Sequence, residues 1–336
     1  MVSPANPVRT PASCKVAICM TTFRRPEGAM SALSGIAGQV FPRTGSVDPL
    51  VIVVDNDAAA PMRERVEGLQ PGYPFPLVYA CETRQGVASA RNRCLDLLPA
   101  DADYMAFIDD DEIPVPQWLD ELVWTARRKN AEIVQGPVLS RFDEGAPDWV
   151  RAGRFLDLGP FPEGETLAWG YSGNVLLSVP LLRRLNLRFD GRFDRSGGED
   201  QHFFIRALRA GCVIHTAPAA IAHESVPSSR ATLRYLARRQ FRVGATLALV
   251  ARIERDGRRA VAVRAAKGFA RMGLGAAKTV VALPRGRHRL AAGLLDVAFG
   301  AGMLAGLLGF SSREYDTIHG AAAPSPDTAL APPPGR

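Results

Sequence analysis

Val16-Ala-Ile-Cys-Met20 forms a short apolar run that ends at Thr21 and Thr22, and Pro26 then opens a helix-length stretch reaching about Gln39. A short apolar run bounded by polar residues is typical of a buried strand, and proline suits the first turn of a helix. The same unit recurs at 50–54 with a helix from 61, at 77–81 with a helix over 87–98, and at 104–108 with a helix over 116–128. Four such units predict an α/β fold with a mostly parallel, doubly wound sheet.

Polar side chains gather where these predicted strands end. Ligands bind at the carboxyl ends of strands in doubly wound sheets, so these side chains should share one crevice. They are Thr21, Thr22 and Arg24 after the first strand, Asp55 and Asp57 after the second, Arg84 and Gly86 after the third, and Asp109, Asp110, Asp111 and Glu112 after the fourth.

The second half of the chain is predicted to continue the sheet and then become helical. Strands are predicted at 131–139, 173–179 and 212–215, a loop at 142–168, a helix at 198–210 and a long helix from 230 to about 256. Residues 258–309 read as further helices. Within them, 294–309 is apolar apart from Asp296, but about 16 residues are fewer than the roughly 20 that cross a bilayer. Basic residues at 252–278 favour an interfacial helix; a helical hairpin packed on the catalytic domain is the alternative.

Charge is unevenly distributed along the chain. The net charge is +7, and residues 225–336 carry 18 Lys and Arg against 6 Asp and Glu, which leaves a net −5 for residues 1–224. A basic C-terminal part favours an anionic partner such as phosphates or a membrane surface. Nucleic acid is disfavoured, because the basic residues alternate with Ala, Val, Leu and Gly rather than with aromatic residues that stack on bases.

The chain ends and the cysteines favour an intracellular protein. Residues 1–13 contain three prolines and no continuous apolar run, which predicts a disordered lead rather than a signal peptide, and 319–336 reads as a disordered Ala/Pro tail. The five cysteines have no ligand-like spacing, so neither a zinc site nor a disulfide framework is predicted. A reducing compartment fits this pattern.

Phe107-Ile-Asp-Asp-Asp-Glu112 is the strongest chemical signal. Carboxylates this close repel one another unless a cation neutralises them, and hard divalent ions prefer oxygen ligands. The run therefore predicts a Mn²⁺ or Mg²⁺ site. The alternative is a solvated acidic turn that caps the helix beginning near Pro116.

Over about residues 14–250 the chain resembles the family 2 glycosyltransferases, which have the GT-A fold. The resemblance rests on Val16 to Arg24, Val51-Ile-Val-Val-Asp-Asn56, Arg84-Gln-Gly-Val-Ala-Ser-Ala-Arg-Asn92, Asp109 to Asp111, Gly173-Asn174 and Gly198-Glu-Asp200. It implies a catalytic domain at 14–228 and leaves 229–318 as a helical, membrane-associating extension. It also implies that Asp109 and Asp111 are the acids of a DxD motif, in which Asp111 binds the metal and Asp109 contacts the ribose of the nucleotide.

The same resemblance assigns roles to other residues. Asp200 is implied as catalytic base and Glu199 as a residue that positions the acceptor, the alternative being that both only stabilise a helix N-terminus. Asp55 is implied as the residue that selects the base, or else as a turn acid, and His223 as a metal ligand or a structural histidine. The remaining predicted nucleotide-sugar contacts are Thr21, Thr22, Arg24, Arg84, Gly86, Arg91, Asp110, Gly173, Asn174, Arg239 and Arg242.

Two departures from the family pattern matter. Many relatives have Asn in place of Arg24. The segment from Arg238 to Arg242 resembles the QxxRW segment of processive members, but Arg239 stands in place of Gln and Val243 in place of Trp, which disfavours a polymerising synthase. For Arg91 a phosphate contact and a plain surface salt bridge remain equally open.

These features predict an inverting, metal-dependent glycosyltransferase. The donor would be a nucleoside-diphosphate sugar, with UDP-hexose favoured, and the acceptor a hydroxyl of a saccharide on a diphosphate lipid. The resemblance extends to bacterial exopolysaccharide glycosyltransferases and implies a peripheral position on the inner face of the cell membrane. The alternatives are a catalytically silent nucleotide-sugar or membrane-binding protein of the same fold, and a nucleotidyltransferase, which the absence of a Gly-rich loop after the first strand disfavours.

Overall fold

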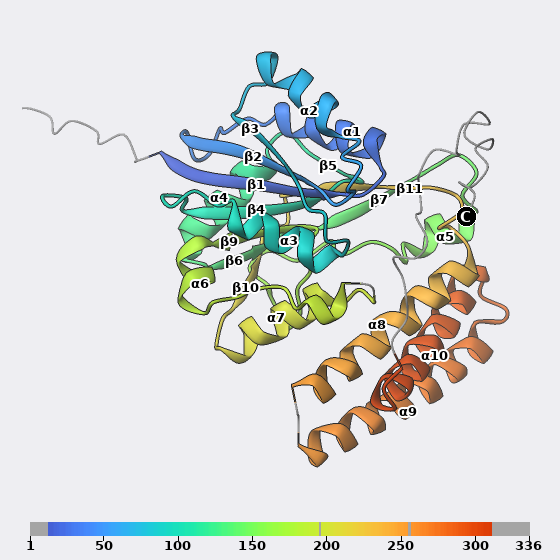
Figure 1. The fold of residues 1–336 in the computed structure, drawn as a ribbon. Coiled ribbons are helices and arrows are strands. Elements are labelled where there is room, and N and C mark those ends of the chain that lie inside the picture. Colours follow the sequence, from blue (N-terminus) through green and yellow to red (C-terminus); the bar gives the residue numbers. More distant parts are fainter. Residues whose placement is uncertain (1–12, 195, 255–256, 311–336) are drawn as a thin grey trace, which may run out of the picture.

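A mixed eight-stranded sheet with helices on both faces forms the centre of the molecule (Figure 1). The computed structural model describes residues 13–310 except 195, 255 and 256, so the predictions for 1–12 and 311–336 lie outside the described residues. The strand order is β3-β2-β1-β4-β9-β6-β10-β8. The strands are β1 (Cys14–Thr22), β2 (Val47–Asp55), β3 (Leu77–Cys81), β4 (Tyr104–Asp109), β6 (Ile133–Gln135), β8 (Thr166–Leu167), β9 (Asn174–Ser178) and β10 (Ile214–Thr216).

The helices of the catalytic part are α1 (Pro26–Ala37), α2 (Arg63–Leu69), α3 (Val87–Asp96), α4 (Trp118–Lys129), α5 (Asp148–Gly153), α6 (Val179–Arg184) and α7 (Glu199–Arg209), with two short 3₁₀ turns, η1 (Gln70–Gly72) and η2 (Gly191–Phe193). The helices α1, α2, α3, α4 and α7 follow the strands as the sequence predicts, whereas the short helices α5 and α6 were not predicted. The predicted α/β class and the doubly wound sheet are confirmed, and the sheet is mixed, because β9 pairs antiparallel with β4 and β6 and β8 pairs antiparallel with β10.

The parallel strands β3, β2, β1 and β4 end at one edge of the sheet. Thr21 pairs with Asp109, and Thr22 pairs with Asp55. The strand centres are continuously buried, because helices cover both faces of the sheet. The polar residues at the strand ends therefore open on one side of the molecule, and this is where the cavity described below lies.

A second, three-stranded sheet was not predicted. It has the order β5-β11-β7 and consists of β5 (Glu112–Pro114), β11 (Ala222–Val226) and β7 (Val138–Phe142). The single strand predicted at 131–139 was wrong, because the chain breaks at Gly136-Pro137 and feeds β6 and β7 into different sheets. The loop predicted at 142–168 also contains α5 and β8.

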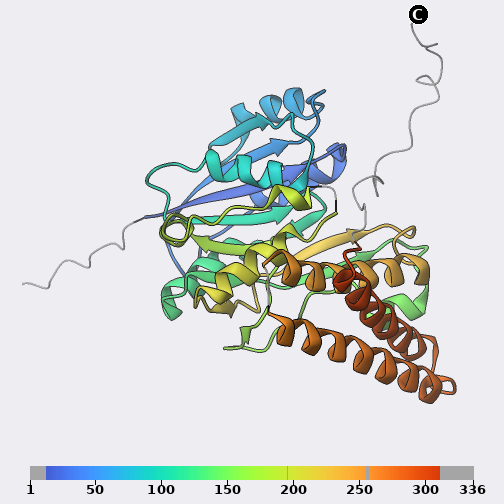
Figure 2. The same ribbon diagram turned by 60° about the horizontal axis from the view of Figure 1, so that its bottom comes forward.

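Three long helices form the C-terminal extension: α8 (Leu233–Ile253), α9 (Arg258–Ala282) and α10 (Arg287–Leu307). Figures 1 and 2 show α8 next to the catalytic part and α9 at the outer edge, and α10 packs extensively on both. The predicted length of the apolar helix was too short, because α10 has 21 residues and is the one helix among the described residues long and apolar enough to cross a membrane. This is weak evidence for a span, since 44% of its most apolar window is buried within the protein.

Glycines bring α10 into backbone contact with both neighbouring helices. A Cβ at Gly302 would overlap the carbonyl oxygen of Phe241 on α8, and a Cβ at Gly300 would lie 2.6 Å from the carbonyl oxygen of Gly268 on α9. Small residues at such positions allow helix backbones to approach closely. The three helices are therefore packed as one unit.

We expect Gly302→Val to force α10 away from α8 and to lower stability by about 3 kcal/mol, the upper part of the range for an overpacked interior. Differential scanning calorimetry of the full chain would measure this as a lower Tm. The matched control is Gly273→Ala on α9, where a Cβ meets nothing within 4 Å and alanine should stabilise the helix by about 1 kcal/mol. Equal Tm values for the two variants would contradict this packing.

Candidate active site

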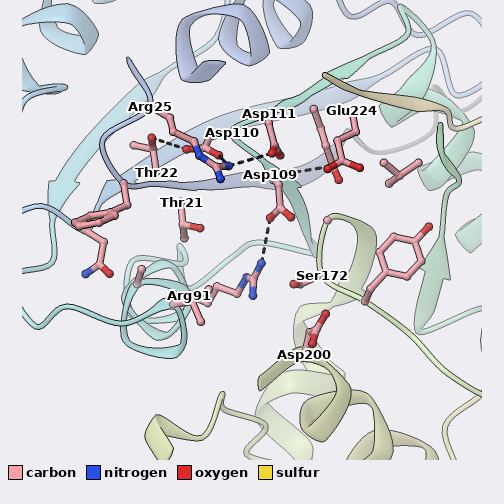
Figure 3. A pocket seen from close by; sticks show the side chains of 18 of the residues that line it. Thr21, Thr22, Arg25, Arg91, Asp109, Asp110, Asp111, Ser172, Asp200 and Glu224 are labelled. Atoms are coloured by element: carbon pink, nitrogen blue, oxygen red, sulfur yellow. Dashed lines mark hydrogen bonds and ion pairs between the residues drawn. The ribbon is translucent and has the colours of Figure 1, made fainter. Parts of the chain in front are cut away.

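A cavity of 490 Å³ lies at the carboxyl ends of the parallel strands and is bounded on another side by α8. Figure 3 shows the acids that follow β4 on one wall and Asp200 of α7 on another, with Arg91 between them. The lining includes five arginines, which are suited to anionic groups of a ligand, and seven acidic residues, which are suited to a cation. Eleven of the predicted site residues line it: Thr21, Thr22, Gly86, Arg91, Asp109, Asp110, Asp111, Gly173 and Asp200, with Arg239 and Arg242 from α8.

The acidic run, residues 109–112, crosses from the end of β4 to the start of β5. Asp110 accepts a hydrogen bond from the Thr22 hydroxyl at 2.8 Å, and a carboxylate oxygen of Glu112 accepts one from the backbone N–H of Asp109 at 3.2 Å. Burial raises the pKa of Asp110 to about 7 and raises the pKa values of Asp109 and Glu112, and repulsion from neighbouring acids adds to each shift. Full ionisation of the run is therefore disfavoured unless positive charge lies nearby.

Arg25 and Arg230, which the sequence analysis missed, neutralise part of this charge. Arg25 lies 3.2 Å from Asp110 and 3.0 Å from Asp111, and Arg230 reaches Asp111 at 3.2 Å from the other side. Arg230 also pairs with Glu224 of β11 at 2.5 Å. Arg230 is only 8% exposed, so it belongs to the buried structure of the site and is not a surface cation.

Arg91 is buried and connects two acids, so it is not a plain surface salt bridge, and its contact with phosphate stays a prediction. Its guanidinium lies 3.1 Å from Asp109 and bonds to Glu199 on its other side. Glu199 is 2% exposed and is not among the residues that line the cavity, so it lies behind Arg91, and its role in positioning the acceptor stays a prediction. Burial raises the pKa of Glu199 to about 7 although Arg91 lowers it. Glu199 holds Arg91 in place from behind.

Asp200 occupies the first turn of α7 and lines the cavity opposite the acidic run (Figure 3). Gly198 caps this helix with φ of 93°, a conformation that favours glycine. A Cβ there would also overlap Thr246 of α8. Thus α8 supports the loop that carries Asp200, and His202 of α7 further bonds to Glu254 at the end of α8, at 2.6 Å.

A scaffold of side chains shapes the loop between β3 and α3. The amide of Asn56 donates to the carbonyl oxygens of Glu82 and Arg84 and accepts a hydrogen bond from the N–H of Gly86. Asp194 accepts from the backbone N–H and the hydroxyl of Ser89. A Cβ at Gly86 would overlap Asp194, which explains why glycine is needed there.

Four predicted nucleotide-sugar contacts lie away from the cavity wall. Arg24 pairs with Asp57 at 2.6 Å, and Arg84 is largely exposed and lies 3.5 Å from Asp194. Asn174 is fully buried, where it accepts from the Trp118 indole and donates to two backbone carbonyls. These three placements correct the prediction that the residues line the cavity.

Asp55 is also fully buried and does not line the cavity. Its carboxylate accepts hydrogen bonds from the backbone N–H groups of Asp57 and Met62 and from the Tyr79 hydroxyl. These bonds anchor the turn after β2. The prediction that it contacts a base is therefore corrected in favour of the turn-acid alternative.

The structure favours the structural alternative for His223 over the metal ligand. It lies on β11, where it pairs with Leu139 of β7 and Ile113 of β5, and it does not line the cavity. Successive side chains of a strand point to opposite faces, so its neighbour Glu224 lines the cavity instead. Burial and the charge of Arg141 lower the pKa of His223, consistent with a neutral structural histidine.

The residues present fit a divalent cation of the kind that the family resemblance implies. The donors are carboxylate oxygens, and the raised pKa values of Asp109 and Asp110 show that the run would gain from added positive charge. Within the described part of the chain, no three His, Cys, Asp or Glu side chains are grouped so that they could hold an ion. Mg²⁺ is commonly held by one or two carboxylates, with phosphate oxygens and water as the other ligands, so Asp109 and Asp111 are sufficient candidates.

The comparisons with known proteins agree with the geometry. Residues 17–185 match the family described as Glycosyl transferase family 2. The chain is 37% identical over 301 residues to succinoglycan biosynthesis protein ExoM of Rhizobium meliloti (strain 1021), covering 89% of this chain and 94% of that protein. It is also 26% identical over 234 residues to glycosyltransferase AglE of Haloferax volcanii, covering 68% and 71% of the two chains.

Among solved structures, S. aureus TarS 1-349 in complex with UDP-GlcNAc is similar, with a TM-score of 0.48 and 14% identity, over 88% of this chain and 92% of that one. From the family match and the identity to ExoM, the chain belongs to the family 2 glycosyltransferases. It is a glycosyltransferase with a GT-A catalytic part and a helical C-terminal extension.

Proposed function

We propose that this protein is an inverting, metal-dependent transferase that moves a sugar, with UDP-hexose the favoured donor, onto a hydroxyl of a lipid-linked saccharide. The observation that carries the proposal is the placement of Asp200 across the cavity from the acidic run, with Arg91 between them. The 37% identity to a succinoglycan biosynthesis protein supports a role in cell-surface polysaccharide synthesis. The lipid acceptor would place the protein on the inner face of the cell membrane.

The proposed reaction is a single displacement. The acceptor hydroxyl gives its proton to the Asp200 carboxylate as its oxygen bonds to the anomeric carbon. The bond from that carbon to the diphosphate breaks, and the nucleoside diphosphate leaves with the electron pair. Attack from the face opposite the leaving group inverts the anomeric configuration, and one well-placed base contributes about 10²- to 10⁴-fold to such a step.

The arginines and the acidic run would have different roles in binding the donor. Arg91, Arg239 and Arg242 line the cavity and would bind phosphate oxygens as charge-assisted donors. Asp111, with Asp109, would hold a Mn²⁺ or Mg²⁺ ion, which when bound supplies charge that stabilises the departing diphosphate. Arg25 and Arg230 hold Asp110 and Asp111 in place from the sides.

Donor hydrolysis tests this function without knowledge of the acceptor, because slow transfer to water needs none. UDP-, dTDP- and GDP-sugars are incubated with the protein, with Mn²⁺ or with EDTA, and nucleotide release is measured. We expect release from a UDP-sugar that requires Mn²⁺. Calorimetric binding of a UDP-sugar without hydrolysis, and without transfer to lipid-linked saccharides extracted from membranes, would favour a catalytically silent binding protein instead.

A further inference from the structure

The outward face of α9 is apolar although none of the described residues covers it. The side that packs on α10 carries the buried residues Gly268, Gly275 and Ala282. The other side exposes Phe269, Leu274, Val280 and Val281 to 58–66%, and Leu283 at the helix end to 67%. Ala and Gly residues fill the positions between them. Figures 1 and 2 both show α9 at the outer edge of the extension.

This concentration of exposed apolar side chains is specific to α9. Among the described residues, six large apolar side chains are more than half exposed; five belong to α9 and its C-terminal cap, and the sixth is Leu308 at the end of α10. Scattered exposed apolar residues need no explanation, but a contiguous face on one helix marks an interaction site.

The charge of α9 indicates which partner this face binds. The helix carries Arg258, Arg259, Arg264, Lys267, Arg271 and Lys278, and no acidic residue. Lys267 and Lys278 are about three helical turns apart and lie on the same side, beside the apolar face. Two copies of so cationic a face would repel each other, whereas an anionic lipid surface complements it.

The apolar helix α10 is by contrast engaged inside the protein. Glycine contacts tie it to α8 and α9, and its one charged residue beyond the first turn, Asp296, bonds to Arg271 at 3.1 Å and to Lys278 at 2.7 Å. Insertion of α10 into a bilayer would break these contacts and bury an acidic group without its partners.

We propose that α9 lies flat on an anionic membrane, with Phe269, Leu274, Val280 and Val281 among the acyl chains and its lysines and arginines at the headgroups. In this arrangement α10 does not enter the bilayer and instead joins α9 to α8. The inference rests on the proposed function insofar as that function places the acceptor on a lipid. It names the helix and the face that meet the lipid surface.

Sedimentation of the full-length protein with vesicles tests this proposal. Vesicles of equal parts phosphatidylglycerol and phosphatidylcholine are compared with vesicles of phosphatidylcholine alone. We expect binding to the anionic vesicles, a loss of at least about tenfold for Phe269→Ser with Leu274→Ser, and a loss of about fivefold for Lys267→Gln, as expected for one charge near such a surface. Val213→Ser is the matched control, since Val213 is 50% exposed on the catalytic part.

Two outcomes would overturn the proposal. Anionic-vesicle binding that is unchanged in the Phe269/Leu274 variant and resists carbonate extraction would assign the membrane contact to α10. A wild-type dimer that the variant converts to a monomer, without vesicle binding by either, would assign the face to a second copy. Donor hydrolysis and transfer to extracted lipid-linked saccharides are measured on the same samples: the absence of both with intact vesicle binding would remove the proposed function and leave the proposed membrane contact of α9 unaffected.

Discussion

Asp200→Asn is expected to lower the rate of sugar transfer by about 10²- to 10⁴-fold, the contribution of a well-placed general base. The amide keeps the shape of the side chain but cannot take the proton of the acceptor hydroxyl. Calorimetric binding of UDP should stay the same, because the arginines and the acidic run across the cavity remain intact. The fold should also persist, since an acidic residue in the first turn of a helix contributes only about 0.3–1 kcal/mol.

The control for this variant is Asp96→Asn. Asp96 forms an exposed ion pair with Arg188 at 2.7 Å, and such a pair contributes about 1 kcal/mol or less. Transfer by this control should equal that of the wild type. Wild-type transfer by Asp200→Asn itself would remove the proposed mechanism.

Asp111→Asn should weaken the Mn²⁺-dependent part of UDP binding by at least about 100-fold, because changes that only affect the partners of metal ligands already cost 10- to 100-fold. Isothermal titration of UDP at several Mn²⁺ concentrations measures this effect separately from turnover. Arg25 and Arg230 keep Asp110 and Glu224 as partners in this variant, so no buried cation loses all of its counter-charge.

His223→Ala is the matched comparison for the metal prediction. His223 lies on the face of β11 opposite to Glu224 and outside the cavity. Its removal should leave the Mn²⁺ dependence unchanged. A loss equal to that of Asp111→Asn would return His223 to the ligand set and contradict the placement described here.

Local sequence patterns were enough to predict the parallel half of the sheet. Apolar runs that end in Thr21-Thr22, Asp55 and Asp109 predict both the strands and the residues at which they end. The carboxyl ends of parallel strands meet at one edge of the sheet. For this reason the acidic run was placed correctly. Asp200 was named through the family resemblance, and the structure places it at the cavity, in the first turn of α7.

The features that the sequence did not predict depend on contacts between residues that are far apart in the chain. The strands β5, β7 and β11 have three to five residues each, too few for a periodic signal, and a one-residue register change exchanges the faces of His223 and Glu224. Arg25 and Arg230 are 205 positions apart and meet only at Asp111. Asp55 and Asn174 ended in the interior because nearby donors satisfied their oxygens, and no local pattern distinguishes that from a ligand contact.

The two faces of α8 have a consequence for how this protein can evolve. Tyr235, Arg239 and Arg242 line the cavity, while Phe241 and Ala245 on the same helix meet the glycines of α10. A chain boundary at residue 228 would thus divide a wall of the active site from its floor. On our proposals, recombination that exchanged the C-terminal extension between relatives would exchange the membrane-binding face and the residues of α8 that line the cavity together. Membrane binding and this part of substrate recognition should therefore be inherited as one unit.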